Sequence, residues 1–292
     1  MHTSTTIQDL QNILEPIRCS NRIGLVPTMG SLHAGHVSLI EECRRLADYV
    51  VLSVFVNPIQ FNSAADLQKY PRNLEQDSLI AQKAGADLVF APGLHEIFPN
   101  GYGLSDQASS DTRILAGNRS NGLCGESRPG HFNGVVTIVG QLFNLIRPRL
   151  AVFGEKDFQQ LQVIRQMVAD LHYQIEIIGA PLIRDADGLA LSSRNALLSE
   201  AQRSQALSIY RSMHTAQADL TRGQRDCGEL KRKVIAEIGR GGLRVDYVEI
   251  VDRSNLESLE RIEHSAQLIV AAFCGDVRLI DNIRLDSPRD SR

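Results

Sequence analysis

Short apolar runs alternate with amphipathic stretches through the first two thirds of this 292-residue chain, and this alternation constrains the fold most. A parallel sheet covered by helices produces such a pattern, because its strands are buried while each helix buries one face. Apolar residues at 161, 164, 168 and 171 predict one such helix. We expect an α/β fold, a Rossmann-like parallel sheet with helices on both faces and strands at residues 23–26, 50–56, 88–90, 150–153 and 175–178.

The pattern changes beyond residue 184. Two helical stretches, at residues 200–222 and about 227–238, precede β-rich segments at 244–251, 268–273 and 277–283. We therefore expect a Rossmann-like domain at residues 1–184 and a smaller C-terminal α+β domain at 185–292. Asp185, Asp187 and Gly188 supply turn chemistry for a hinge near residues 183–189. A Gly-, Ser- and Asn-rich stretch at 99–130 predicts a long loop, of which residues 101–122 match no motif.

Charge and cysteine usage exclude several classes of protein. The formal net charge is −3 and no basic run is present, which argues against a nucleic-acid binder. The five cysteines are scattered and form no C-x-x-C pair, as expected for reduced thiols that serve in packing. The first residues lack a secretory pattern, and no apolar run approaches the roughly 20 residues of a membrane span. We expect a cytoplasmic protein without membrane partners.

The segment at residues 27–36 joins the first strand to a helix through a glycine-bearing turn. Unpaired N–H groups and the helix dipole favour an anion at such a junction. His33 and His36 are three residues apart, so both imidazoles can reach one phosphate and protonate a leaving oxygen. Two simpler interpretations remain open: the glycines only ease a tight turn, or the H-x-x-H pair binds a metal. The segment is neither a Walker A loop nor a G-x-G-x-x-G fingerprint.

Polar residues follow other predicted strands, and ligands bind at the carboxyl ends of strands in open α/β sheets. Asn57 and Gln60 suit a ligand with hydroxyls and a carboxylate, or they are solvated amides of a capped loop. Lys156 offers a charge to a phosphate, whereas Asp157 can cap a helix or bind a ribose or metal. Arg194, after two serines, either clamps phosphates or belongs to a serine-rich turn.

Six motifs in order resemble the pantoate-β-alanine ligase family, the pantothenate synthetases of the nucleotidylyl-transferase superfamily. The motifs span nearly the whole chain. They are P-T-M-G-x-L-H-x-G-H at 27–36, F-V-N-P-x-Q-F at 55–61, Y-P-R at 70–72, R-P-G-H-F at 128–132, G-E-K-D-x-Q-Q at 154–160 and D-G-L-A-L-S-S-R-N at 187–195. H-x-G-H alone indicates the superfamily, whereas N-P-x-Q-F and G-E-K-D-x-Q-Q point to this family.

The resemblance implies an ATP-dependent condensation of pantoate with β-alanine through a pantoyl adenylate, giving pantothenate, AMP and pyrophosphate. It implies His36 as proton donor, with His33, Lys156 and Arg194 also catalytic. It assigns Gln60 to pantoate and β-alanine and Gln160 to pantoate, with Asn57 in support. The ATP-binding residues it implies are Pro27, Thr28, Met29, Gly30, Ser31, Leu32, His33, Ala34, Gly35, His36, Gly154, Glu155, Lys156, Asp157, Ile183, Leu191, Ser192, Ser193 and Arg194.

The resemblance also implies Mg²⁺ and a homodimer. Because a pantoyl adenylate is prone to hydrolysis, we expect the C-terminal domain to act as a lid that excludes water. Asp77 is the expected metal-linked residue, although Gln76 stands where relatives often carry a second acid. Because Mg²⁺ needs few protein ligands, the phosphates could supply much of its coordination. Three other functions compete: a different H-x-G-H adenylyltransferase, a class I aminoacyl-tRNA synthetase, and a catalytically silent nucleotide sensor. The first would leave a lasting nucleotidyl product, the second needs a basic tRNA surface, and the third has little need of two substrate glutamines.

Overall fold

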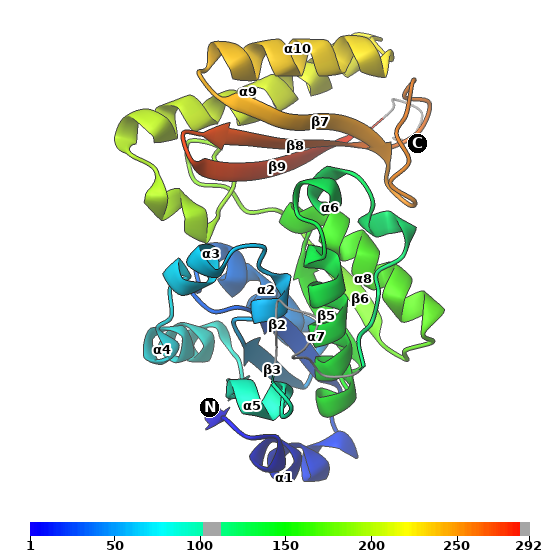
Figure 1. Cartoon of the computed structure of the whole chain (residues 1–292). Coiled ribbons are helices and arrows are strands. Elements are labelled where there is room, and N and C mark those ends of the chain that lie inside the picture. Colours follow the sequence, from blue (N-terminus) through cyan, green and yellow to red (C-terminus); the bar gives the residue numbers. More distant parts are fainter. Residues whose placement is uncertain (102–111, 287–292) are drawn as a thin grey trace. The chain divides into compact units, whose positions relative to one another are not determined.

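A computed structural model describes residues 1–101 and 112–286 of the chain (Figure 1). Contacts divide the described chain into two compact units. The first contains residues 1–155 and 163–181, and the second contains residues 156–162 and 182–292. The predicted boundary at 184/185 lies close to residue 182, but the short segment 156–162 groups with the second unit. The central part of the expected loop, residues 102–111, lies outside the described residues.

The first unit is built on a six-stranded sheet in the order β1-β4-β3-β2-β5-β6, with every neighbouring pair parallel. Leu25 and Val26 are consecutive in the sequence and both fully buried, so helices and connections cover both faces of β2. The expected α/β class is thus confirmed. The strands are β1 (His2–Ser4), β2 (Ile23–Thr28), β3 (Tyr49–Val54), β4 (Leu88–Phe90), β5 (Leu150–Gly154) and β6 (Glu176–Ala180).

Helices connect these strands, as the amphipathic stretches predict. One buried cluster joins Val26, Leu52 and Val152 from the sheet to Ile40 of α2 and Ala81 of α4. The helices up to β6 are α1 (Ile7–Arg18), α2 (Ala34–Leu46), α3 (Ala64–Lys69), α4 (Leu74–Ala84), α5 (Leu94–Ile97), α6 (Leu123–Ser127), α7 (His131–Ile146) and α8 (Phe158–Asp170), with 3₁₀ turns η1 (Pro58–Gln60), η2 (Asn118–Ser120) and η3 (Glu155–Asp157).

The elements differ from expectation at several ends. Strand β2 continues through Pro27 and Thr28, whereas β3 stops before the polar turn at Asn57. The predicted apolar stripe holds for Leu161 and Ile164, which are fully buried, but Leu171 lies beyond α8 and is 49% exposed. The sequence pattern did not predict strand β1 or helix α1. Short helical turns occupy parts of the expected loop after residue 112.

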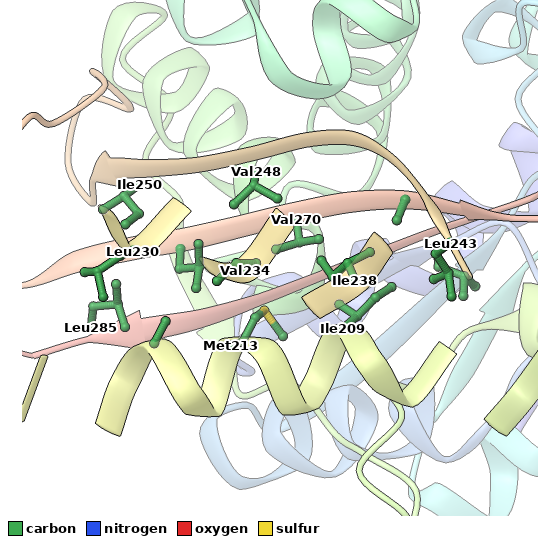
Figure 2. Close-up of a cluster of buried hydrophobic side chains, with 14 of the residues drawn as sticks. Ile209, Met213, Leu230, Val234, Ile238, Leu243, Val248, Ile250, Val270 and Leu285 are labelled. Carbon is green, nitrogen blue, oxygen red and sulfur yellow. The ribbon is translucent and has the colours of Figure 1, made fainter. Parts of the chain in front are cut away.

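The second unit is an antiparallel sheet in the order β7-β8-β9 with two long helices, in agreement with the expected α+β class. Figure 2 shows its core, where Met213 of α9 and Val234 of α10 meet Val270 of β8. Asp226 begins α10 by accepting a hydrogen bond from the Glu229 N–H group. The elements are η4 (Ser193–Leu197), α9 (Glu200–Thr221), α10 (Cys227–Arg240), β7 (Arg244–Asp252), β8 (Ala266–Cys274) and β9 (Val277–Leu285).

The expected hinge is an ordered turn. The Gly188 N–H group donates to the Asp185 carbonyl oxygen at 2.9 Å, and Gly188 has a positive φ of 98°. Arg203 of α9 forms ion pairs with Asp185 and Asp187 at 2.7 and 2.8 Å. These ion pairs connect the turn to the long helix, so the two aspartates do more than terminate local structure.

The cysteines are all free thiols, as the sequence predicts. Cys43, Cys227 and Cys274 are buried, and burial raises the pKa of Cys43 to about 12. Its thiol therefore remains protonated and acts as a small apolar group. In the part of the chain that the structure describes, no helix has the length and apolar character needed to cross a bilayer.

Candidate active site

The H-x-G-H turn is shaped by a carboxylate from a distant helix. Asp77 of α4 is 2% exposed, and its two oxygens accept hydrogen bonds from the Ser31 and Leu32 N–H groups at 2.9 and 2.8 Å. Gly30 and Ser31 both have positive φ angles, 80° and 56°. A Cβ atom on Gly30 would lie 2.7 Å from the Asp77 Oδ2 atom. Glycine is thus required at position 30 because the carboxylate occupies that space.

His33 and His36 form a capping box at the start of α2. His33 is the N-cap residue, and its Nδ1 atom accepts from the Gly35 N–H group at 3.1 Å. The Nδ1 atom of His36 accepts in turn from the His33 N–H group at 3.3 Å. The ring centroids are 4.2 Å apart. Because both Nδ1 atoms accept, each neutral ring carries its proton on Nε2, where it can be donated to a phosphate oxygen.

Most main-chain N–H groups of the turn already have acceptors within the protein. Gly30 donates to the Thr28 hydroxyl at 3.2 Å, and the donors of Ser31, Leu32, His33 and Gly35 are those described above. An anion here would therefore meet the imidazoles and the positive end of the α2 dipole rather than a cradle of unpaired N–H groups. The sequence did not reveal this difference, since Asp77 lies more than 40 residues away.

The amides after β3 lie against the same turn. Asn57 and Gln60 are 1% and 7% exposed, and the Asn57 Nδ2 atom donates to the Gln60 Oε1 atom at 3.1 Å. The Gln60 Nε2 atom lies 2.6 Å from the Met29 sulfur. The predicted nucleotide and substrate segments thus meet directly at Met29 and Gln60. The Asn57 Oδ1 atom is buried without a hydrogen-bond partner in the described structure, so one acceptor beside Gln60 is left unsatisfied.

Residues of the R-P-G-H-F motif support Gln60, a role that sequence reasoning missed. The Gln60 carbonyl oxygen lies 2.9 Å from the His131 Nδ1 atom and accepts from the Arg128 guanidinium at 3.3 Å. The first turns of α7 contact η1 closely, because a Cβ atom on Gly134 would lie 2.8 Å from the Gln60 nitrogen. The motif match was the available signal, and it assigned no role to these residues.

A cavity of about 340 Å³ opens beside the turn, near the carboxyl ends of β2, β3 and β4. Met29, Pro58, Arg72 and Asp77 are among its lining residues. Its size falls at the lower end of the range for small-molecule pockets. Within residues 1–101 and 112–286, no three His, Cys, Asp or Glu side chains gather where they could hold a metal ion. Since both Asp77 oxygens accept N–H groups, the surroundings of Asp77 form no ready ligand set for Mg²⁺.

Gly154 and Glu155 belong to the first unit, whereas the other predicted residues after β5 belong to the second. The Lys156 Nζ atom lies 3.6 Å from the Asp157 carboxylate, and the Lys156 side chain is 19% exposed. The Asn282 side chain donates to the Lys156 carbonyl oxygen at 2.9 Å, which holds this segment to β9. Gln160 is partly exposed in the first turn of α8.

The last predicted motif forms one local structure in the second unit. The Leu191 N–H group donates to the Ile183 carbonyl oxygen at 3.0 Å, so these two residues expected in the ATP site are adjacent. Ser192 is the N-cap residue of η4, and its hydroxyl accepts from the Arg194 N–H group at 3.3 Å. Ser193 begins this 3₁₀ turn. The serine-rich turn is therefore present, and the role of Arg194 as a phosphate clamp stays a prediction.

Comparison with known proteins gives a consistent result. The family model for pantoate-beta-alanine ligase matches residues 2–284. The chain is 45% identical over 287 residues to a pantothenate synthetase of Pseudomonas fluorescens strain Pf0-1, with 98% of each sequence covered. It is 44% identical over 286 residues to a pantothenate synthetase of Marinobacter nauticus, with 98% of this chain and 99% of the relative covered.

Solved structures show the same similarity. A pantothenate synthetase from Thermus thermophilus has a TM-score of 0.90 and 41% identity, covering 98% of this chain and 100% of its own. A pantoate-beta-alanine ligase from Francisella tularensis, complexed with beta-gamma ATP and beta-alanine, has a TM-score of 0.78 and 34% identity, with 97% of each chain covered.

Proposed function

The chain belongs to the pantoate-beta-alanine ligase family, and from that premise we propose roles for its individual residues. The enzyme is an AMP-forming ligase that condenses pantoate with β-alanine at the expense of ATP. The observation that carries the proposal is the contact between Met29 and Gln60, which joins the H-x-G-H turn to the buried amides. A nucleotide and a small polyol acid bound at these segments would lie side by side.

The chemistry requires activation of a carboxylate, because oxide is too poor a leaving group for direct attack by an amine. We propose that a pantoate carboxylate oxygen attacks the α-phosphorus of ATP, and that the bond to the bridging oxygen breaks as pyrophosphate leaves. The β-alanine amine then attacks the acyl carbon of the pantoyl adenylate. The bond to AMP breaks, the nitrogen loses a proton, and pantothenate and AMP remain. No covalent enzyme intermediate is needed.

His36 is the proposed proton donor, with His33 beside it. The capping box leaves each Nδ1 atom as an acceptor, so a neutral ring presents its Nε2–H group as a donor. Such a group stabilises the charge that grows on pyrophosphate, and proton transfer of this kind contributes roughly 10²–10⁴-fold to a rate.

The remaining ATP contacts in the proposal come from both units. Residues 27–36, with Gly154 and Glu155, would line the nucleotide in the first unit. In the second, Lys156 and Arg194 would place positive charge on the phosphates, and Ser192 and Ser193 would add hydroxyl donors. Asp157 would bind ribose, while Ile183 and Leu191 would contact adenine. The backbone hydrogen bond between Ile183 and Leu191 supports their assignment to the same part of the site.

Gln60, Asn57 and Gln160 are the proposed substrate residues. The Gln60 amide lies beside the turn, and the buried Asn57 Oδ1 atom has an unused lone pair for a pantoate hydroxyl. Gln60 would also orient β-alanine, and Gln160 would bind pantoate from α8. The hydrogen bond between Asn57 and Gln60 fixes the orientation of both amides.

Mg²⁺ is proposed to arrive with the phosphates of ATP. Mg²⁺ keeps several waters and needs few protein ligands in phosphate sites. The hydrogen bonds from Ser31 and Leu32 to Asp77 support a second interpretation of that residue, in which it shapes the turn instead of binding the ion. We further propose a cytoplasmic homodimer without nucleic-acid or membrane partners. Size-exclusion chromatography with light scattering would test the dimer.

An omission assay tests the reaction scheme. Purified protein is incubated with ATP, Mg²⁺, pantoate and β-alanine, and each substrate is left out in turn. Pyrophosphate is expected without β-alanine, and AMP release only with it. A stable nucleotidyl product would instead support another adenylyltransferase activity, and no turnover would support a sensor. Gln60→Ala should weaken use of pantoate while ATP binding is retained. A selective loss of ATP binding would show instead that Gln60 belongs to the ATP pocket.

A further inference from the structure

A second cavity lies in the first unit at the end of the sheet opposite the H-x-G-H turn. It measures about 560 Å³, and its lining includes Ile23, Arg149 and Ile175. These residues stand at or just before the first residues of β2, β5 and β6. Because the strands are parallel, their amino ends lie away from the edge that carries the proposed catalytic residues. No step of the proposed reaction uses this cavity.

Three arginines give the cavity a positive charge. Arg18 pairs with Glu15 at 2.8 Å and donates to the Leu145 carbonyl oxygen at 2.9 Å, but its Nε atom is buried without a partner. The side chains of Arg147 and Arg149 form no ion pair or hydrogen bond within the described chain. The charge of these two guanidinium groups is therefore uncompensated at the rim.

Hydrogen bonds hold the main chain of both rim arginines in place, while their side chains are exposed. Arg147 ends α7 with a positive φ of 52°, a conformation that non-glycine residues adopt rarely, and its N–H group donates to the Phe143 carbonyl oxygen at 2.9 Å. Arg149 donates its N–H to the Ile23 carbonyl oxygen at 2.8 Å and accepts from the Glu176 N–H group at 3.0 Å. The segment that carries the charges is thus anchored to α7 and to two strands.

Carboxylates close to the cavity are already engaged. Glu176 pairs with Arg22 at 2.7 Å, and Glu15 pairs with Arg18. Asn21, Asn144 and Gln174 add polar side chains to the wall. Its aromatic part is the Tyr173 ring, which packs edge-on against Phe143 with centroids 5.4 Å apart. The cavity therefore combines forked cationic donors with an aromatic surface.

We propose that this cavity binds a small phosphate ester whose anionic group lies between Arg147 and Arg149 and whose apolar body lies on Tyr173. Guanidinium groups suit a phosphate because their parallel N–H donors match two of its oxygens. The aromatic wall favours an organic phosphate over the inorganic ion, since burial of apolar surface adds to binding. The site is distinct from the proposed ATP site in residues and in position within the first unit.

Titration with 1-naphthyl phosphate, followed by its fluorescence and by calorimetry, tests the proposal. The measurement is made on the full chain with the ATP site saturated by a non-hydrolysable ATP analogue. The variant combines Arg147→Asn, which tolerates the left-handed backbone, with Arg149→Ala. Loss of two charge-assisted contacts is expected to weaken binding roughly 30-fold or more. The matched control, Arg211→Ala with Arg240→Ala, removes the same charge from exposed arginines of the second unit and should change binding less than about twofold.

Each outcome decides the proposal. Equal binding by wild type and cavity variant, equal losses in variant and control, or no binding to the wild type while the ATP analogue is present would overturn it. Inorganic phosphate should bind at least about tenfold more weakly than the naphthyl ester, and equal affinities would overturn the assignment of an apolar body. Thermal unfolding checks that the double variant folds. Should it fail to fold, Arg149→Ala alone is expected to lose about tenfold in affinity, and unchanged binding would count against the site.

Discussion

At the scale of single residues, the two histidines serve structure and chemistry with different atoms. Their Nδ1 atoms cap α2, and their Nε2 atoms remain in place to carry the protons that the proposed reaction needs. The simpler interpretation of the motif, a tight glycine turn, is correct for Gly30 and does not exclude the catalytic one. A mutation of His36 therefore has two consequences that must be separated.

Substitution of His36 by asparagine separates them. The Asn side-chain oxygen can replace Nδ1 as acceptor of the His33 N–H group, but it offers nothing at the position of Nε2. We expect a roughly 10²–10⁴-fold loss in the rate of pyrophosphate release with a nearly unchanged unfolding temperature. His36→Ala, the comparison variant, should lose stability as well. Near-normal pyrophosphate release by His36→Asn would remove His36 as proton donor.

Asp77→Asn distinguishes shaping of the turn from binding of the metal. One oxygen becomes an NH₂ group facing a backbone N–H group, so at least one of the two hydrogen bonds is lost. If Asp77 shapes the turn, the rate should fall roughly 10-fold or more with the same Mg²⁺ concentration for half-maximal activity. A large rise in that Mg²⁺ concentration would show instead that Asp77 is a ligand. Asp87→Asn, which alters a carboxylate that also accepts a backbone N–H group but lies outside the turn, serves as the control.

At the scale of elements, the substrate amides depend on the contact between α7 and η1. A Cβ atom at Gly134 would meet backbone atoms of Ile59 and Gln60 at 2.6 and 2.8 Å, which cannot move without shifting η1. We expect Gly134→Ala to cost about 1–3 kcal/mol of unfolding free energy despite its better helix propensity. The KM for pantoate should rise as well. Urea unfolding measures the loss of stability, and steady-state kinetics measures the KM.

Gly140→Ala on the same helix is the matched control. Its Cβ atom would meet the end of the flexible Ile114 side chain, at 2.5 Å from Cδ1, which can rotate away. Its stability and KM should therefore stay close to those of the wild type. If the two variants behaved alike, close approach of α7 to η1 would not be what positions Gln60.

Element types followed from the sequence more reliably than their ends. Buried strands and amphipathic helices reveal themselves by periodicity, so β4, α9 and α10 lie close to prediction. Strand β1 has three residues and pairs only with β4, which leaves too short a pattern to detect. The expected strand at residues 23–26 ends too early, because the ladder from β2 to β3 persists through Thr28.

At the scale of the whole molecule, the residues expected to bind ATP belong to both units. His36 lies in the first, whereas Lys156 and Arg194 lie in the second. A ligand that contacts all three would restrain the two units with respect to each other. We expect ATP with pantoate to change the solution scattering profile, and Arg194→Ala to reduce the change. An identical profile with and without both ligands would argue against closure of the second unit as a lid.

The sequence by itself determined the fold class, the family and the candidate residues to which we assign the chemistry. Periodicity and ordered motifs are local properties, and local properties can be read along a chain. Only the tertiary structure decided how these residues are held: Asp77 on the turn, Met29 against Gln60, and Gly134 against η1. Such contacts join segments tens of residues apart through loops whose paths are set by packing of the whole unit. No local pattern encodes them.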